Sequence, residues 1–248
     1  VMEAMPAPRS FTYPGEAVER PVVFIPVFPG SNCDYDTAKA FRQAGAEVRS
    51  EVFCNLTAEA IFDSIRRMKE AIAACHIFVL CGGFSAGDEP DGSAKFIASF
   101  FRSPAVTEAV RDLLQHRDGL MLGICNGFQA LIKLGLAAYG DIRPITSCDP
   151  TLTFNTIGRH QSMLVRTRVA STGSPWLSHC DAGSEYEIAI SHGEGRFVAP
   201  QEVLDTMLRN GQVATQYVDG AGVPSLDIDV NPNGSIMSIE GIFSPDGR

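Results

Sequence analysis

The sequence predicts an α/β protein with a mostly parallel central sheet, to which the C-terminal half adds antiparallel strands. Three apolar runs, at residues 21–28, 76–81 and 119–124, have the length of buried strands. Segments with helical spacing of apolar residues alternate with these runs. Strands that alternate with helices form parallel sheets covered on both faces. The second half of the chain is richer in strand-like segments joined by turns, which predicts antiparallel pairing there.

The first half provides the elements of the parallel sheet in order. The strand that ends at Pro29-Gly30 leads to a helix over 35–44, where Ala38 and Phe41 are helically spaced. Weak alternation predicts a strand over 47–53, and Asn55 or Thr57 can cap a helix after it. The further elements predicted here are helices over 58–73, up to 101, over 104–116 and from about 127, and a loop over 84–95.

The second half of the chain has a different pattern, in which predicted strands are joined by turns. Strands are predicted at 163–169, 186–190, 213–218 and 236–242, with turns at 218–220 and 231–234. Residues 1–20 contain three prolines and no apolar periodicity, which predicts a linker before a domain at 21–248. The Val1-Met2 start and the polar turn at 244–248 lead us to expect a piece of a longer protein.

Composition excludes several function classes. The net charge of -9 argues against a nucleic-acid partner, since phosphate backbones require clustered Lys and Arg. We expect neither a membrane span nor a signal peptide, because no apolar run is long enough. The seven cysteines contain no Cys-x-x-Cys pair, so we expect reduced thiols, no metal site and a cytoplasmic location.

Cys125 is the strongest candidate for a catalytic residue. It lies in Gly123-Ile124-Cys125-Asn126-Gly127, between a predicted buried strand and a helix. In such an elbow the central residue adopts a strained conformation, and the flanking glycines remove the clashes. The helix N-terminus favours a thiolate, and the Asn126 N–H would face an oxyanion. The alternative is a small buried hydrophobic residue, the usual role of a cysteine that is not in a disulfide.

A second strand end points to the same place. Gly82 and Gly83 directly follow the strand at 76–81, and ligands of such sheets bind at the carboxyl ends of the strands. Backbone N–H groups at two glycines can approach a substrate closely, so this pair could complete an oxyanion hole. An ordinary tight turn is the alternative.

The general base is harder to predict. Cysteine catalysis of acyl transfer usually needs a histidine oriented by a carboxylate. His76 and His116 are expected to be structural, and the polar segments around His160 and His179 give no local sign of such a pairing. His192 is the most suggestive, because it lies among glycines after a predicted strand with Glu194 two residues on. Its expected role is that of a loop residue that shapes the substrate pocket, and a triad base is the alternative.

One metal pattern is rejected on its context. Asp229, Asn231, Asn233 and Glu240 have the spacing of a calcium loop. The flanking segments contain glycines and prolines instead of the two helices that such a loop requires. We expect a β-turn here instead.

Taken together, these motifs resemble a known family. Residues 123–129, including Gln129, resemble the nucleophile motif of triad (class I) glutamine amidotransferases. Within them, Phe28–Asp34, Gly82–Asp88, Ser191–Phe197 and Asn231–Ser235 resemble the glutaminase part of phosphoribosylformylglycinamidine synthase of purine biosynthesis. Residues 88–96 resemble the form in which this domain is the C-terminal part of a long fused synthase.

The resemblance implies a fold, a reaction and a partner. The fold is a flavodoxin-like three-layer sandwich. Cys125 attacks the side-chain amide of glutamine, with Gly82, Gly83, Asn126, Gln129 and His192 around the oxyanion and substrate. The ammonia passes to a formylglycinamide ribonucleotide synthetase domain, which uses ATP and magnesium, whereas the glutaminase itself needs no cofactor.

The same resemblance leaves the base unassigned. The family's triad His and Glu form a His-x-Glu motif that is expected after Arg248, so this chain by itself is expected to be inactive. Two alternatives stay open: a non-catalytic docking module, and a cysteine peptidase or deglycase-like relative on the same fold.

Overall fold

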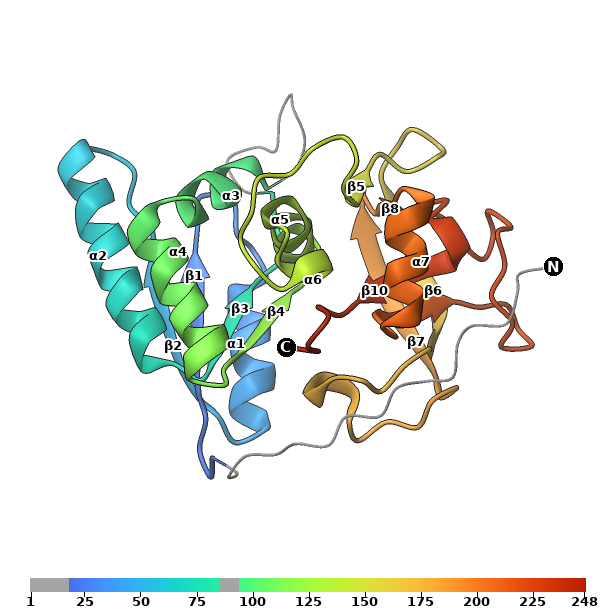
Figure 1. Ribbon diagram of the computed structural model, residues 1–248, viewed down its shortest axis with the longest axis horizontal. Coiled ribbons are helices and arrows are strands. Elements are labelled where there is room, and N and C mark those ends of the chain that lie inside the picture. The colour runs from blue at the N-terminus through green and yellow to red at the C-terminus, as the bar shows by residue number, and fades with distance from the viewer. Residues whose placement is uncertain (1–17, 85–93) are drawn as a thin grey trace. The chain divides into compact units, whose positions relative to one another are not determined.

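The computed structural model describes residues 18–84 and 94–248, which form two compact units (Figure 1). Of the described residues, the N-terminal unit contains 18–134 without the gap, together with 141–143, and the C-terminal unit contains 135–140 together with 144–248. Most of the predicted linker at 1–20 and of the predicted loop at 84–95 lies outside the described residues. The same holds for most of the 88–96 stretch.

The N-terminal unit contains the predicted parallel sheet. Its four strands pair side by side in the order β2-β1-β3-β4, and every pair is parallel. The register sets Leu80 of β3 opposite Gly123 of β4. The carboxyl ends of these strands therefore meet at one edge of the sheet. The strands are β1 (Val22–Val27), β2 (Glu47–Val52), β3 (Ile77–Leu80) and β4 (Leu120–Gly123).

Helices cover both faces of this sheet. Val23 and Ile25 point to one face and pack with Ala38 of α1. Phe78 points to the other face, where its ring centroid lies 5.5 Å from that of Phe101 in α3. This unit therefore has the predicted three layers. Its helices are α1 (Asp34–Gln43), α2 (Ala58–Ala74), α3 (Lys95–Phe101), α4 (Pro104–Arg111), η2 (Asp112–His116) and α5 (Asn126–Leu134).

The helix predicted over 104–116 is α-helical only to Arg111. It continues as the π-helical turn η2, in which the Arg117 N–H donates to the Asp112 carbonyl at 3.0 Å. Gly119 packs so closely on Leu113 that a β-carbon on Gly119 would lie 2.1 Å from the Leu113 side chain. The chain thus turns tightly from this helix into β4. Within the described parts of the chain, every helix is too short or too polar to cross a membrane.

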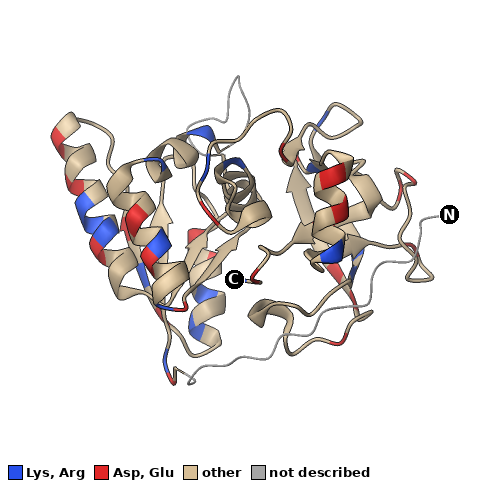
Figure 2. Ribbon diagram, viewed as in Figure 1, with Lys and Arg blue, Asp and Glu red and all other residues tan. Residues whose placement is uncertain are grey.

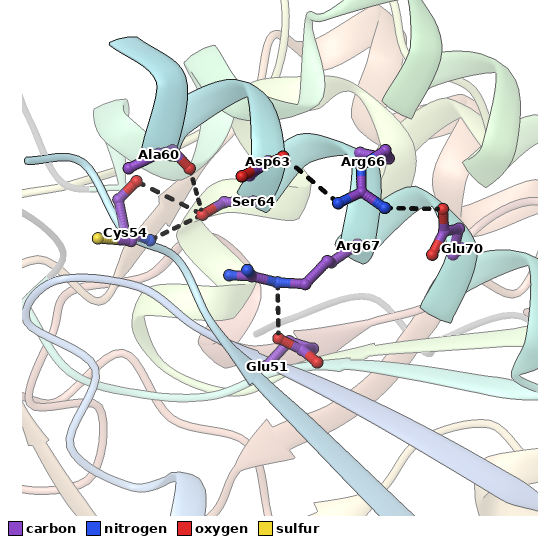
Figure 3. Close-up of polar contacts among 8 residues, drawn as sticks. All are labelled: Glu51, Cys54, Ala60, Asp63, Ser64, Arg66, Arg67 and Glu70. Atoms are coloured by element: carbon purple, nitrogen blue, oxygen red, sulfur yellow. Dashed lines mark hydrogen bonds and ion pairs between the residues drawn. The ribbon is translucent and has the colours of Figure 1, made fainter. Parts of the chain in front are cut away.

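Ser64 joins α2 to the end of β2 (Figure 3). It is completely buried; its hydroxyl accepts from the Cys54 N–H at 3.0 Å and donates to the Ala60 carbonyl at 2.8 Å. Nearby, Arg67 of α2 forms an ion pair with Glu51 of β2 at 3.3 Å. Figure 2 shows charges of both signs along α2, as expected for a helix with a solvent-facing side.

Replacing Ser64 with alanine should lower the free energy of unfolding by about 1–3 kcal/mol, because the Cys54 N–H loses its partner inside the protein. Asp63→Ala is the matched control on the same helix. It removes only an exposed ion pair with Arg66, so a change of about 0–1 kcal/mol is expected. Urea unfolding measures both, and equal effects of the two substitutions would contradict the role assigned to Ser64.

The C-terminal unit contains the predicted antiparallel strands, and they form sheets of their own. One sheet has the order β10-β9-β6-β7, and β5 pairs with β8 in a second. The elements are α6 (Leu136–Tyr139), β5 (Thr151–Thr153), β6 (Gln161–Val169), η3 (Pro175–Leu177), β7 (Glu185–His192), β8 (Arg196–Val198), α7 (Gln201–Arg209), β9 (Val213–Tyr217), η4 (Ile236–Ser238) and β10 (Ile239–Ile242).

Several features of this unit differ from the sequence prediction, and two of them have a clear local cause. The strand predicted at 236–242 begins only at Ile239, because Met237 and Ser238 have positive φ and form a helical turn. Helix α7 was not predicted, although Leu204 and Met207 give it a buried face. The turn predicted at 231–234 is present, closed by a 3.0 Å bond from the Gly234 N–H to the Asn231 carbonyl.

Candidate active site

Cys125 lies in the turn between β4 and α5, as predicted. Its φ is 53°, in the left-handed region that non-glycine residues rarely adopt. The Ile124 N–H donates to the Leu80 carbonyl at 3.0 Å, which ties the turn to β3. Cys125 is half-buried, so its thiol is not sealed in the core. Strain of this kind concentrates at functional sites.

The two glycines of the elbow are required by packing. A β-carbon on Gly127 would lie 2.0 Å from the Leu80 carbonyl oxygen. A β-carbon on Gly123 would lie 2.7 Å from the Gly127 carbonyl group and from Leu131. Larger residues at either position would push α5 away from the sheet. The Gly-x-Cys-x-Gly pattern therefore reflects how closely the helix approaches the strand ends.

Asn126 and Gln129 support the elbow from inside the helix. Both side chains are buried, and the Asn126 amide donates to the Gln129 side-chain oxygen at 2.9 Å. The Gln129 N–H donates to the Cys125 carbonyl at 3.0 Å. Asn126 is the first residue of α5, and the N–H groups of a first helical turn point outward along the helix axis.

Gly82 and Gly83 lie beside Cys125, at the end of β3. A β-carbon on Gly82 would be 3.4 Å from the Cys125 β-carbon. Gly83 has a φ of 140°, and a β-carbon on it would lie 2.4 Å from the Gly30 carbonyl oxygen. Gly83 also forms a β-bridge with Ser31, in the loop after β1. The structure thus brings the ends of β1, β3 and β4 together around the thiol.

Cys33 is a neighbour of this site to which the sequence pattern gave no role. Its sulfur lies 3.4 Å from the same Gly82 β-carbon position that Cys125 contacts. Its place directly after the β1 turn was the available signal, since that loop also reaches the carboxyl edge of the sheet.

Two other thiols of this unit have low reactivity as nucleophiles. Cys75 and Cys81 are buried, and burial raises the pKa of each to about 11. Both are therefore protonated at neutral pH and poorly nucleophilic. All seven cysteines lie within the described residues and carry thiols.

The two histidines of the N-terminal unit, His76 and His116, make contacts away from Cys125. The His76 ring accepts from the Val22 N–H at 3.0 Å, at the start of β1 and β3 and thus at the sheet edge opposite Cys125. His116 lies in η2, 3.6 Å from an Asp112 carboxylate oxygen.

His192 belongs to the C-terminal unit, at the end of β7. Its carbonyl accepts from the Asn155 side-chain amide at 2.8 Å, and its ring packs so closely on Gly195 that a β-carbon there would lie 2.2 Å away. Burial lowers the pKa of His192, and the nearby His160 lowers it further. The ring is therefore neutral at physiological pH.

This lowered pKa predicts a pH dependence of stability. As the pH falls below the ordinary pKa of 6.5, the unfolded chain takes up a proton at His192 before the folded protein does. Above that pH, the titration of His192 does not reduce the free energy of unfolding. Below it, this titration lowers the free energy of unfolding progressively. The unfolding free energy of His192→Gln should fall less between pH 7 and pH 5 than that of the wild type. His179→Gln, at an exposed position of the same unit, is the control, and parallel pH profiles for His192→Gln and the wild type would contradict the prediction.

Side chains of the rejected calcium pattern form hydrogen bonds with other residues of the C-terminal unit. The Asn231 amide donates to the Ser235 carbonyl at 2.8 Å, and the Asn233 amide donates to the Tyr217 hydroxyl at 2.7 Å. The partly buried Glu240 carboxylate accepts from the Thr215 hydroxyl. Burial raises the pKa of Glu240. Among residues 18–84 and 94–248, no three His, Cys, Asp or Glu side chains are grouped to hold a metal ion.

Comparisons with known proteins agree with this geometry. Residues 20–248 match the model of the CobB/CobQ-like glutamine amidotransferase domain. The phosphoribosylformylglycinamidine synthase subunit PurQ of Aquifex aeolicus is 32% identical over 90% of this chain and 84% of its own length. That of Mycobacterium tuberculosis is 34% identical over 90% and 81%. A solved structure, PurLQS from Thermotoga maritima, matches with a TM-score of 0.64 at 25% identity, over 92% of this chain and 84% of the other.

Proposed function

The chain belongs to the family of CobB/CobQ-like glutamine amidotransferase domains, and from this premise we propose that it hydrolyses glutamine through Cys125. The ammonia serves the conversion of formylglycinamide ribonucleotide to its amidine in purine biosynthesis, as the names of the PurQ relatives indicate. The observation that carries the proposal is the strained, half-buried Cys125 beside Gly82, at the edge where three strand ends meet.

The geometry supports a thioester mechanism. The Cys125 sulfur attacks the side-chain amide carbon of glutamine, and the carbonyl oxygen becomes an oxyanion. Backbone N–H groups at Gly83 and at Asn126, on either side of the thiol, stabilise that charge. Ammonia leaves with a proton, and water then cleaves the thioester to release glutamate. Positioned N–H groups of this kind typically contribute about 3–4 kcal/mol of transition-state stabilisation.

The proposal assigns supporting roles to the remaining site residues. Gln129 and Asn126 hold the first turn of α5 through their mutual hydrogen bond, which keeps the Asn126 N–H in place. The role expected for His192, in the other unit, as a loop residue of the substrate pocket stays a prediction. A histidine of the His-x-Glu motif that the family resemblance implies acts as the general base.

A synthetase completes the reaction. The Thermotoga maritima protein was solved as PurLQS, a name that joins the Q component to L and S components, and this supports a synthetase partner for the present chain. We propose that this partner binds ATP and magnesium and that the glutaminase domain at 21–248 needs no cofactor of its own. The proposal also includes a cytoplasmic location, and a linker at 1–20 that joins the domain to the synthetase region of a fused chain.

An electrophilic glutamine analogue tests the proposal directly. In a form extended past Arg248, a chloroketone analogue of glutamine should label Cys125 and abolish glutamate release, and excess glutamine should protect. Peptide mass spectrometry locates the label. Cys148→Ala, which changes an exposed thiol of the other unit, should be labelled like the wild type. Labelling at another cysteine, or none in the extended form, would refute the role of Cys125.

The same assay tests the source of the base. The 248-residue form should release glutamate several orders of magnitude more slowly than the extended form, because it lacks the proposed base. Equal rates in the two forms would show that a histidine within residues 1–248 acts instead.

A further inference from the structure

Two thiols that are far apart in the sequence lie against the same glycine. The sulfur of Cys33 and the β-carbon of Cys125 are each 3.4 Å from the point where a Gly82 β-carbon would stand. The two atoms are therefore less than about 7 Å apart, with no side chain on Gly82 between them. Cys33 ends the loop after β1, and Cys125 ends the turn after β4, so two different strand ends bring them together.

Cys33 and Cys125 are more accessible to solvent than Cys81, the third thiol near Gly82. Cys33 is exposed and Cys125 is half-buried, so a small oxidant in water can reach both. Cys81 precedes Gly82 but is only 5% exposed, with its thiol in the core that packs against α1. Of the thiols near Gly82, Cys33 and Cys125 are therefore the accessible pair.

We propose that Cys33 and Cys125 form a reversible disulfide under oxidation by a hydroperoxide, which switches the nucleophile off and protects it. The Cys125 thiolate attacks the peroxide oxygen and becomes a sulfenic acid, with hydroxide as the leaving group. The Cys33 thiol then attacks the sulfenic sulfur, forming the S–S bond and releasing water. Two thiols lose two electrons and two protons in total, and one hydrogen peroxide becomes two waters.

The local structure allows the closing movement. Disulfide formation requires the two β-carbons to come within about 4.5 Å of each other. Cys33 lies at the junction of a loop and the first turn of α1, where its thiol donates to the Asn32 side chain at 2.9 Å. That bond is exposed and weak, since a thiol is a poor donor. Rotation of the Cys33 side chain brings its sulfur toward Cys125, and a shift of the loop that carries Cys33 closes the remaining distance between the β-carbons.

The consequence for activity follows from the proposed function and rests on it. A sulfur in a disulfide cannot attack an amide, so oxidation would stop ammonia production. The sulfenic acid of a lone thiol is oxidised further to the irreversible sulfinic acid. With Cys33 beside it, the damage stops at a disulfide that a thiol reductant reverses.

Mass spectrometry after mild peroxide treatment tests the proposal. The full-length reduced protein is oxidised with hydrogen peroxide, its remaining thiols are alkylated, and it is digested without reductant. We expect a linked pair of peptides that contain Cys33 and Cys125, lighter by two hydrogen atoms than the separate peptides and lost after dithiothreitol. A link from Cys33 to Cys81, or no link while Cys125 is oxidised, would overturn the proposal.

Matched variants give a second readout. The variants are made in the form extended past Arg248 and treated with peroxide. Dithiothreitol should then restore glutaminase activity in the wild type and in Cys148→Ser. It should not restore activity in Cys33→Ser, where Cys125 should be oxidised to the sulfinic acid. Gly82→Ala puts a methyl group at van der Waals distance from the Cys33 sulfur and the Cys125 β-carbon. It should lower the amount of linked peptide, which is measured by mass spectrometry alone. Equal recovery of Cys33→Ser and wild type would refute the protective role. Because the linked peptide is detected without any activity measurement, loss of the disulfide and failure of the proposed function are distinguishable.

Discussion

Replacing Cys125 with alanine should lower the rate of glutamate release from glutamine by roughly four to six orders of magnitude, the scale seen when a covalent nucleophile is removed. The reason is chemical, since no thioester can form without the sulfur. Alanine removes a single sulfur from a half-buried position, so the fold should persist. The measurement is glutamate release by the form extended past Arg248, alone and in complex with its synthetase.

Two controls separate loss of chemistry from loss of structure. Cys148→Ala changes an exposed thiol and should leave the rate unchanged. Ammonium ions supplied to the Cys125→Ala complex should restore amidine formation, because the synthetase then receives ammonia without the glutaminase. Glutamate release that survives Cys125→Ala would show that another residue is the nucleophile. Failure of ammonium to rescue the complex would point to a disrupted fold.

The second large effect is expected for Gly127→Ala. The new β-carbon would lie 2.0 Å from the Leu80 carbonyl oxygen and 2.6 Å from its carbon. Both atoms belong to the backbone of β3 at its pairing with β4, so neither can rotate aside. Overpacking a core usually costs about 1–3 kcal/mol, and this contact should reach or exceed the upper end. The shift of α5 should also move Cys125 and abolish labelling by the glutamine analogue.

A graded series of glycine substitutions controls this prediction. Gly123→Ala would put its β-carbon 2.7 Å from the Gly127 carbonyl group, a less severe contact, and should destabilise the protein less than Gly127→Ala. Gly220→Ala meets no atom within 4 Å and should change the unfolding free energy by less than about 0.5 kcal/mol. Urea unfolding gives the order. Wild-type stability and labelling in Gly127→Ala would contradict the packing of the elbow.

Local signals determined much of the candidate site. The apolar runs before Gly82 and Cys125 predicted two neighbouring strands, and parallel strands put their carboxyl ends at one edge. The Gly-x-Cys-x-Gly spacing predicted the elbow, and the positive φ of Cys125 confirms the strained turn. These predictions succeeded because each depends on interactions between residues close in the sequence.

Other features depend on contacts that no short stretch of sequence contains. Strands β5 and β8 have three residues each, too few for a periodic pattern, and only their pairing with each other defines them. The antiparallel strands form separate sheets because they pair with one another, and this pairing joins segments that are distant in the sequence.

The sequence by itself predicted Cys125 as the candidate nucleophile, and it determined the parallel sheet that presents this residue and the family to which the chain belongs. The tertiary structure alone added Cys33 to the groups around that residue and showed how closely they pack. Cys33 approaches Cys125 across Gly82 because three strand ends converge, although the two thiols are 92 positions apart in the chain. Gly127 is required because α5 packs directly on the Leu80 carbonyl. Close packing between distant segments is a property of the folded chain, and it sets the surroundings in which the thiol reacts.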